Sequence, residues 1–160
     1  MSVRAARTSD VDALASLWHE GWQDAHARIV PAELARHRTL ESFRRRLRDA
    51  LAEVRVAGSP DGPLGFSMLR GDELNQFYVS RAARGTGVAA RLIADAEERL
   101  AADGIETAWL ACAIGNERAA RFYDKSGWIR VGNMIEHLPT PDGVLSLEVW
   151  RYEKDLRRDV

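Results

Sequence analysis

The chain has 160 residues, of which 46% are hydrophobic and 29% charged. These proportions are ordinary for a folded protein and argue against disorder, and the length suits one domain over residues 1–160. A formal net charge of −1 argues against nucleic-acid binding, which requires a basic surface. No stretch approaches the roughly 18 apolar residues of a membrane span, and no signal peptide is visible, so we expect a cytoplasmic protein without a membrane partner.

The first third of the chain predicts one short strand and three helices. Val3–Ala5 reads as the strand, and Ser9 is placed to cap the helix that follows. The apolar face of that helix is predicted from residues at helical spacing: Val11, Leu14, Trp18 and Trp22. Pro31 suits the first turn of a second helix, and a third helix carries Phe43 and Leu47.

Four arginines cluster on this third helix, at positions 44–46 and 48. The apolar positions of the same helix are Phe43, Leu47 and Leu51. The arginines are therefore predicted to form a solvated helix face.

The rest of the chain alternates strands and helices. Strands are expected at 54–56, 64–69, 73–79, 107–113, 128–134 and 144–152, and helices from 88 to near Gly104 and at 117–125. The last two strands are expected to be joined by a loop containing Pro139, Pro141 and Gly143. This order predicts an α/β (α+β) protein with a mixed sheet and helices on both faces.

A glycine-rich turn follows the strand that ends at Val79, and a helix begins directly after it. Gly85 and Gly87 allow a ligand to approach the backbone, and the free N–H groups of the helix start favour an anion such as pyrophosphate. A nucleoside-triphosphate loop is excluded because Gly87 is not followed by Lys-Ser or Lys-Thr. A dinucleotide fingerprint fits poorly, since the turn lies mid-chain and no acidic residue ends a second strand about 20 positions later.

The six residues Arg84-Gly85-Thr86-Gly87-Val88-Ala89 satisfy the pattern R/Q-x-x-G-x-G/A. Downstream, residues 116–128 combine an N-capping Asn116, the pair Phe122-Tyr123 and Gly127-Trp128, and Gly127 is placed to end a helix in the left-handed conformation. With these motifs, and with the helix–loop–helix of residues 18–34, the chain resembles the GNAT superfamily of acyl-coenzyme A-dependent N-acetyltransferases. The resemblance runs from Val3 to about Leu156.

The resemblance implies a mostly antiparallel sheet of about seven strands that splays open beside the strand leading to the phosphate loop. It implies acetyl-coenzyme A as co-substrate and no metal ion. The residues that it assigns to cofactor binding are Phe77, Tyr78, Val79, Arg84, Gly85, Thr86, Gly87, Val88, Ala89, Asn116, Phe122 and Tyr123. Asn116 can also act simply as a helix cap.

Acetyl transfer to an amine needs a proton donor for the departing thiolate and a base for the amine. By the resemblance, Tyr123 is the expected donor and Glu73 the expected base. Tyr123 could instead only pack against the cofactor, and Glu73 could be a solvated strand end, with Asp72 and a water chain as rival bases. Of the histidines, His26 alone is kept as a reserve base.

The acceptor side is expected to include Trp22, His26, Trp109 and the loop 136–144, although ordinary packing explains each of them as well. Acidic residues expected near the acceptor, with basic residues on the cofactor side, favour a cationic small amine. The acidic set is Glu20, Asp24, Glu33, Asp72 and Glu73, and the basic set is Arg81, Arg84 and Arg91.

The predicted function is therefore an N-acetyltransferase that acts on the primary amine of a small molecule by direct attack. A non-catalytic acyl-coenzyme A-binding or sensing module, and an acetyltransferase for a protein N-terminus or lysine, are the alternatives. A homodimer is left open. Cys112 lies in an apolar strand and is predicted to be a buried thiol rather than a nucleophile.

Overall fold

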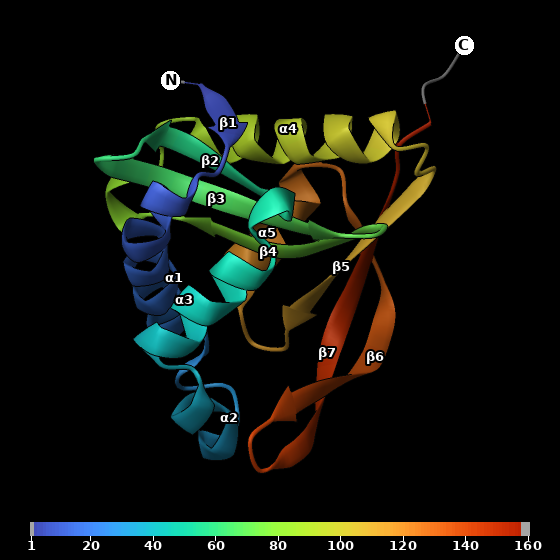
Figure 1. Ribbon diagram of the computed structural model, residues 1–160. Coiled ribbons are helices and arrows are strands. Elements are labelled where there is room, and N and C mark those ends of the chain that lie inside the picture. The colour runs from blue at the N-terminus through green and yellow to red at the C-terminus, as the bar shows by residue number, and fades with distance from the viewer. Residues whose placement is uncertain (1, 158–160) are drawn as a thin grey trace.

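Residues 2–157 are described by the computed structural model, and their centre is a seven-stranded sheet (Figure 1). The strand order is β1-β2-β3-β4-β5-β7-β6, and within these residues only β4 and β5 pair in parallel. The strands are β1 (Val3–Ala5), β2 (Val54–Ser59), β3 (Gly62–Arg70), β4 (Glu73–Val79), β5 (Thr107–Ala113), β6 (Ile129–Thr140) and β7 (Gly143–Asp155). The predicted mixed, mostly antiparallel sheet is confirmed.

Helices cover both faces of this sheet, as expected (Figure 1). The α-helices are α1 (Val11–His26), α2 (Ala32–His37), α3 (Leu40–Asp49), α4 (Val88–Ala102) and α5 (Glu117–Lys125). Short 3-10 turns lie at η1 (Thr8–Asp10), η2 (Leu51–Glu53) and η3 (Arg81–Ala83). One core joins α1 and α3 to β2 and β3, and a second joins α4 and α5 to β5 and β7.

The apolar face predicted for α1 is correct. Leu14 and Trp18 are fully buried, and Trp18 packs against Phe43 of α3 with 4.6 Å between ring centroids. Burial of such large side chains stabilises the fold by about 1.5–3 kcal/mol each. The predicted cap was wrong: Asp10, not Ser9, accepts the N–H of Arg7 at 2.7 Å, and its buried carboxylate is paired with Arg4 at 2.8 Å.

The loop predicted between the last two strands is also wrong. β6 continues to Thr140 and β7 begins at Gly143, so the two strands form one long hairpin with a tight turn. Pro139 lies on the outer edge of the sheet, because β6 is its last strand, and an edge position tolerates the missing N–H of proline. The hairpin therefore carries Glu136 and His137 on a strand rather than on a loop.

The sheet opens between β4 and β5. These strands have one register pair, Glu73 with Trp109, and the N–H of Trp109 donates to the carbonyl of Asp72 at 3.2 Å. No further pairing follows as β4 continues to Val79 and β5 to Ala113. The expected splay beside β4 is therefore present, and it leaves backbone groups of both strands free at the opening.

No helix within residues 2–157 is both long enough and apolar enough to span a membrane.

Candidate active site

The glycine-rich turn after β4 presents bare backbone at the start of α4. Gly85 and Gly87 have φ values of +76° and +87°, and a Cβ on either would meet no other protein atom within 4 Å. Gly87 is the N-cap of α4 and brings no capping side chain to the helix. Free N–H groups, a favourable helix dipole and open space in front of the glycines suit an oxyanion such as the pyrophosphate of coenzyme A.

The other residues of this turn fix its shape or pair with a charge nearby. The hydroxyl of Thr86 donates to the carbonyl of Ala83, which closes the turn. Val88 is buried in the core under α4, so only its backbone is available to a ligand. Arg84 lies 3.9 Å from Asp24, and Arg81 pairs with the same carboxylate at 2.6 Å.

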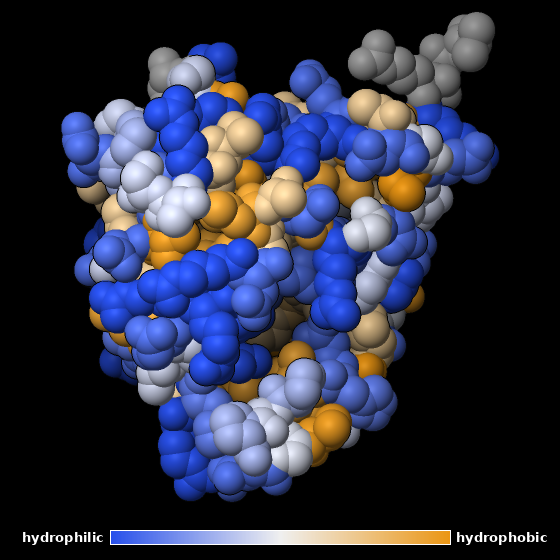
Figure 2. Space-filling model, viewed as in Figure 1, coloured by the Kyte–Doolittle hydropathy of each residue, from blue (hydrophilic) through white to orange (hydrophobic). Residues whose placement is uncertain are grey.

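A cavity of about 710 Å³ begins at the opening between β4 and β5. It extends to α2, α3 and the β6–β7 hairpin, and Figure 2 shows the surface hollowed between these elements with hydrophilic residues around the mouth. It brings together predicted site residues from α1, β4, β5 and α5 with its cap: Trp22, His26, Glu73, Phe77, Tyr78, Trp109, Asn116 and Tyr123. The remaining predicted residues, the loop 84–89 with Val79 and Phe122, do not line it.

Asn116 caps α5 as predicted, because its side chain accepts the N–H of Ala119 at 3.4 Å. Phe122 stacks on Phe77 of β4, with 5.4 Å between ring centroids. Together these contacts hold α5 across the opening of the sheet. Gly127 ends the helix at φ +85°, also as predicted.

Tyr123 reaches the cavity from α5. Its side chain is 8% exposed, and its ring lies among those of Phe77, Trp128 and Tyr152. Within residues 2–157 its hydroxyl makes no hydrogen bond. Burial raises the pKa of the Tyr123 phenol above its ordinary value, so the group stays protonated at neutral pH and can donate to a ligand.

Glu73 is 7% exposed at the start of β4 and accepts a hydrogen bond from Asn75 at 3.1 Å. Burial raises the pKa of Glu73, and the nearby charge of Glu136 raises it further. Burial also raises the pKa of Glu136, while Arg38 and Arg46 lower it. Glu73 is thus a buried carboxyl facing the cavity rather than a solvated strand end. Glu136 is a second carboxyl that lines the cavity, half-buried, and the sequence placed it only at the start of a predicted loop.

His26 lies at the end of α1, with Nδ1 3.5 Å from the hydroxyl of Tyr78. Burial, followed by the charge of Arg38, lowers the pKa of His26 to about 4. The imidazole is therefore neutral at pH 7. Trp22, one turn earlier, is 5% exposed and packs beside it with 5.5 Å between ring centroids.

The expected charge pattern on the acceptor side is only partly present, because Glu73 alone of its five acidic residues lines the cavity. Asp24 turns toward Arg81 and Arg84, which also lower its pKa, and neither Glu20 nor Glu33 lines the cavity. The cavity is lined by four arginines and two carboxyl groups: Arg38, Arg45, Arg46, Arg70, Glu73 and Glu136. The helical arginines are thus only partly a solvated face.

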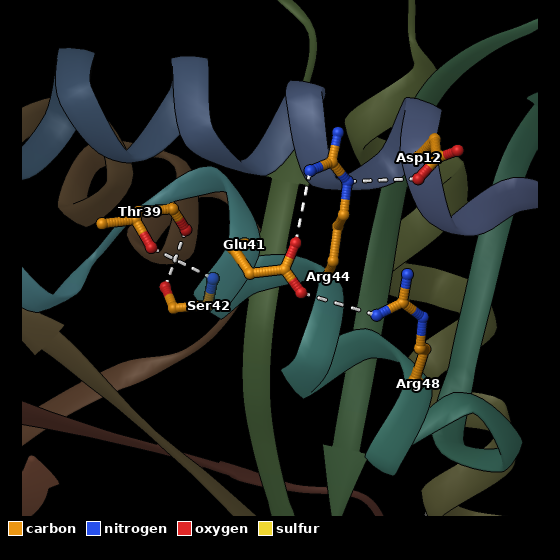
Figure 3. Close-up of polar contacts among 6 residues, drawn as sticks. All are labelled: Asp12, Thr39, Glu41, Ser42, Arg44 and Arg48. Atoms are coloured by element: carbon orange, nitrogen blue, oxygen red, sulfur yellow. Dashed lines mark hydrogen bonds and ion pairs between the residues drawn. The ribbon is translucent and has the colours of Figure 1, made fainter. Parts of the chain in front are cut away.

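The sequence does not separate Arg46 from Arg44. Each lies next to one fully buried residue of α3 and three positions from the other, Phe43 or Leu47. Arg44 and Arg48 lie on the outer face, where they contact Asp12 and Glu41 (Figure 3). The side chain and carbonyl of Thr39, bonded to Ser42, fix the start of this helix.

Beside the end of the cavity that His37 and Pro141 line, Asp142 in the turn between β6 and β7 bridges the hairpin to α2. Its Oδ2 lies 2.9 Å from Nε2 of His37 and 3.4 Å from Arg36, both on α2. These contacts join the tip of the hairpin to α2 (Figure 1).

Cys112 is buried as predicted, and burial raises the pKa of its thiol to about 12. The thiol is protonated at neutral pH, so it does not provide a nucleophilic thiolate.

Comparison with known proteins identifies the family and the fold. The sequence model of the acetyltransferase (GNAT) family matches residues 12–128. The chain belongs to this family. No curated protein sequence matched the chain.

Several solved N-acetyltransferase structures share the fold. The PaiA N-acetyltransferase from Thermoplasma acidophilum, in complex with coenzyme A, is 18% identical over 96% of this chain and 98% of its own, with a TM-score of 0.66. Aminoglycoside 6'-acetyltransferase type Ii is 18% identical over 100% of both chains, with a TM-score of 0.70. Ribosomal-protein-alanine N-acetyltransferase from Brucella melitensis is 20% identical over 97% of this chain and 99% of its own, with a TM-score of 0.65.

Proposed function

We propose that this GNAT protein is an N-acetyltransferase that moves the acetyl group of acetyl-coenzyme A to the primary amine of a small molecule by direct attack. The observation that carries the proposal is that the β4–β5 opening meets the cavity at the hydroxyl of Tyr123, which makes no hydrogen bond within residues 2–157. A thioester lying in the opening would have a proton donor on one side and an acceptor space on the other. No covalent enzyme intermediate is needed, since the one cysteine is a buried thiol.

The proposed coenzyme A site follows the exposed backbone. The turn from Arg84 to Ala89 would hold the pyrophosphate, with N–H groups as the main donors. The free edge of β4 at Phe77, Tyr78 and Val79 would accept the pantetheine chain as an added strand, opposite Asn116. Phe122 would support Phe77 from behind.

The proposed chemistry needs two proton transfers: one proton is removed from the acceptor ammonium, and one is donated to the departing thiolate. An alkyl ammonium with a pKa of about 10.4 is neutral only about once in a thousand at pH 7, so a base is valuable. Glu73 is the proposed base, acting directly or through water, because its raised pKa brings it nearer to the working pH. Tyr123 is the proposed donor to the departing thiolate.

The bridged end of the cavity favours a small acceptor over a protein. A peptide lying between α2 and the hairpin would have to displace the contacts of Asp142 with Arg36 and His37. Trp22, His26 and Trp109 line the remaining walls and would contact the acceptor. An acetyltransferase for a protein N-terminus or lysine is the alternative with the same chemistry.

A panel of amines tests the proposal, with free-thiol release from acetyl-coenzyme A as the readout. The panel should include amino acids, polyamines, aminoglycosides and N-terminal peptides. Thiol release that depends on a small amine supports the proposal, and release only with peptides supports the protein acceptor. Tight coenzyme A binding without release for any amine would support an acyl-coenzyme A-binding module instead.

A further inference from the structure

Four arginines line the cavity without an ion pair within residues 2–157, and Arg38 and Arg46 are the two of them that are half-buried. We propose that the acceptor carries an anionic group, a carboxylate or a phosphate, in addition to its amine, and that Arg38 and Arg46 bind this group. The inference rests on the proposed acetyltransferase function and specifies the substrate class of the same site. It adds an anionic group to the cationic small amine that the sequence led us to expect.

Arg46 is fixed in place without using its hydrogen-bonding edge. Its guanidinium carbon lies 4.5 Å from the ring centroid of Trp18 and 6.0 Å from that of Phe43. Stacking on an aromatic face orients the planar group and leaves its N–H donors free at the rim. Within residues 2–157 no carboxylate lies within 4.0 Å of the Arg46 side chain.

Arg38 completes the pair from the end of α2. It is half-buried, lines the same cavity and likewise makes no ion pair within the described residues. Its charge lowers the pKa of both Arg46 and His26, and all three groups line the same cavity. Two half-buried cations that repel each other cost stability, and an anion bound between them would remove that cost.

Arg44 and Arg48, which lie on the outer face of α3, differ from Arg46 in having carboxylate partners. Arg44 pairs with Asp12 at 3.1 Å and with Glu41 at 3.4 Å, and Arg48 lies 3.7 Å from Glu41 (Figure 3). The outer arginines thus have carboxylate partners even though water at the surface could solvate their charge. The inner ones lack such partners although they are partly desolvated, and this is the arrangement expected of a ligand-binding site.

The position of the pair suits an acceptor with charges of both signs. Glu73 and Glu136 line the same cavity, and the pKa of Glu136 responds to Arg38 and Arg46, while the pKa of Glu73 responds to Glu136. An acceptor could therefore place its anion on the arginines and its ammonium near the carboxyl groups. The phosphates of coenzyme A have a separate candidate site at the start of α4, where the turn residues 84–89 do not line the cavity.

Matched acceptors test the inference directly. L-leucine is compared with L-leucinamide and isopentylamine, and O-phosphoethanolamine with ethanolamine. We expect kcat/KM to be about ten- to a hundredfold higher for the anionic member of a pair, and the two series separate a carboxylate from a phosphate. In Arg46→Met and in Arg38→Met the ratio of kcat/KM for the anionic acceptor to that for the neutral acceptor should fall to near one. The main cause should be a higher KM for the anionic acceptor, while KM of acetyl-coenzyme A stays unchanged.

Arg44→Met is the matched control, because it removes the same charge from the outer face of the same helix. It should retain the full preference for the anionic acceptor. Equal rates for anionic and neutral acceptors in the wild-type protein, or a preference that survives in both cavity variants, would overturn the inference and leave the proposed function standing.

A measurement without turnover separates the two proposals. Binding of N-acetyl-L-leucine and of N-acetyl-L-leucinamide in the presence of coenzyme A is followed by calorimetry. Anion-dependent binding that is lost in Arg46→Met supports the anion site, whether or not any amine is acetylated. A failure to acetylate every amine would contradict the proposed function and not the anion site. Binding that is indifferent to the carboxylate overturns the anion site.

Discussion

The ring of Tyr123 on α5 meets the ring of Phe77 on β4 edge-on, with 6.4 Å between their centroids and 64° between their planes. This contact spans the opening of the sheet and fixes the phenol at the inner end of the cavity. The hydroxyl is thereby held by packing alone, and its hydrogen-bonding capacity is left to a ligand.

Tyr123→Phe should keep this packing and remove only the donor. We expect kcat to fall about ten- to a thousandfold with little change in coenzyme A affinity, if chemistry limits the rate. Steady-state kinetics and calorimetry check this. Tyr152→Phe is the control, since that hydroxyl accepts from Arg130 away from the cavity. An unchanged kcat in Tyr123→Phe would reduce Tyr123 to a packing role.

Gly87→Val should abolish coenzyme A binding and leave the fold intact. The new side chain meets no protein atom, so its effects are a backbone penalty of about 1–2 kcal/mol and obstruction of the ligand. Gly104→Val is a close control, because Gly104 has φ +84° and equally open surroundings at the other end of α4. Both variants should lose similar thermal stability, and only Gly87→Val should lose affinity by calorimetry. Equal affinity in the two would refute the assignment of the loop.

Glu73→Gln should lower kcat by about a hundred- to ten-thousandfold if Glu73 is the base. It should also raise Tm at neutral pH, because burial raises the pKa of Glu73 and its ionisation therefore opposes folding. This penalty is absent below the unfolded-state pKa of about 4.3 and grows as pH rises through the folded-state pKa. The gain in Tm should thus be larger at pH 8 than at pH 5. Glu98→Gln on the exposed face of α4 should show neither effect.

Asp142→Ala should loosen the end of the cavity by releasing the hairpin from α2. The exposed ion pairs contribute little to stability, so Tm should hardly change. We expect kcat/KM to fall about two- to fivefold for small amines and to rise for N-terminal peptides. Asp61→Ala in the turn between β2 and β3 is the control. If Asp142→Ala does not raise the rates with peptides, the contact of Asp142 with α2 no longer supports a small acceptor.

The sequence predicted those parts of the site that lie within one motif. The glycine turn and the Asn116-capped helix α5 follow from local backbone requirements, so the stretches 84–89 and 116–128 each contain the needed information. Arg38, Arg46 and Glu136 come from α2, α3 and β6, and no local pattern brings them together. The helical arginines looked alike as a run, and only the packing of Trp18 against Phe43 distinguishes Arg46 from Arg44.

The hairpin shows a second limit of local reasoning. Pro139 and Pro141 indicated a loop, because proline interrupts a sheet in most positions. The register of β6 on β7 nonetheless runs from Ile129 to Thr140, and β6 is free on its other side. Whether a strand lies at the edge of a sheet depends on topology, which the two prolines alone do not specify.

The single register pair between β4 and β5 divides the backbone hydrogen bonds of the sheet into two ladders, one of β1–β4 and one of β5, β7 and β6. One apolar core lies mainly beside β2 and β3, and another lies mainly beside β5 and β7 but also includes Leu69 of β3 and Leu74 of β4. The two halves can therefore open with different free energies. A ligand chain bound along the opening would supply the missing bonds and couple the halves. Amide hydrogen exchange should therefore slow together in both ladders when coenzyme A binds, so that the substrate serves as the strand that completes the sheet.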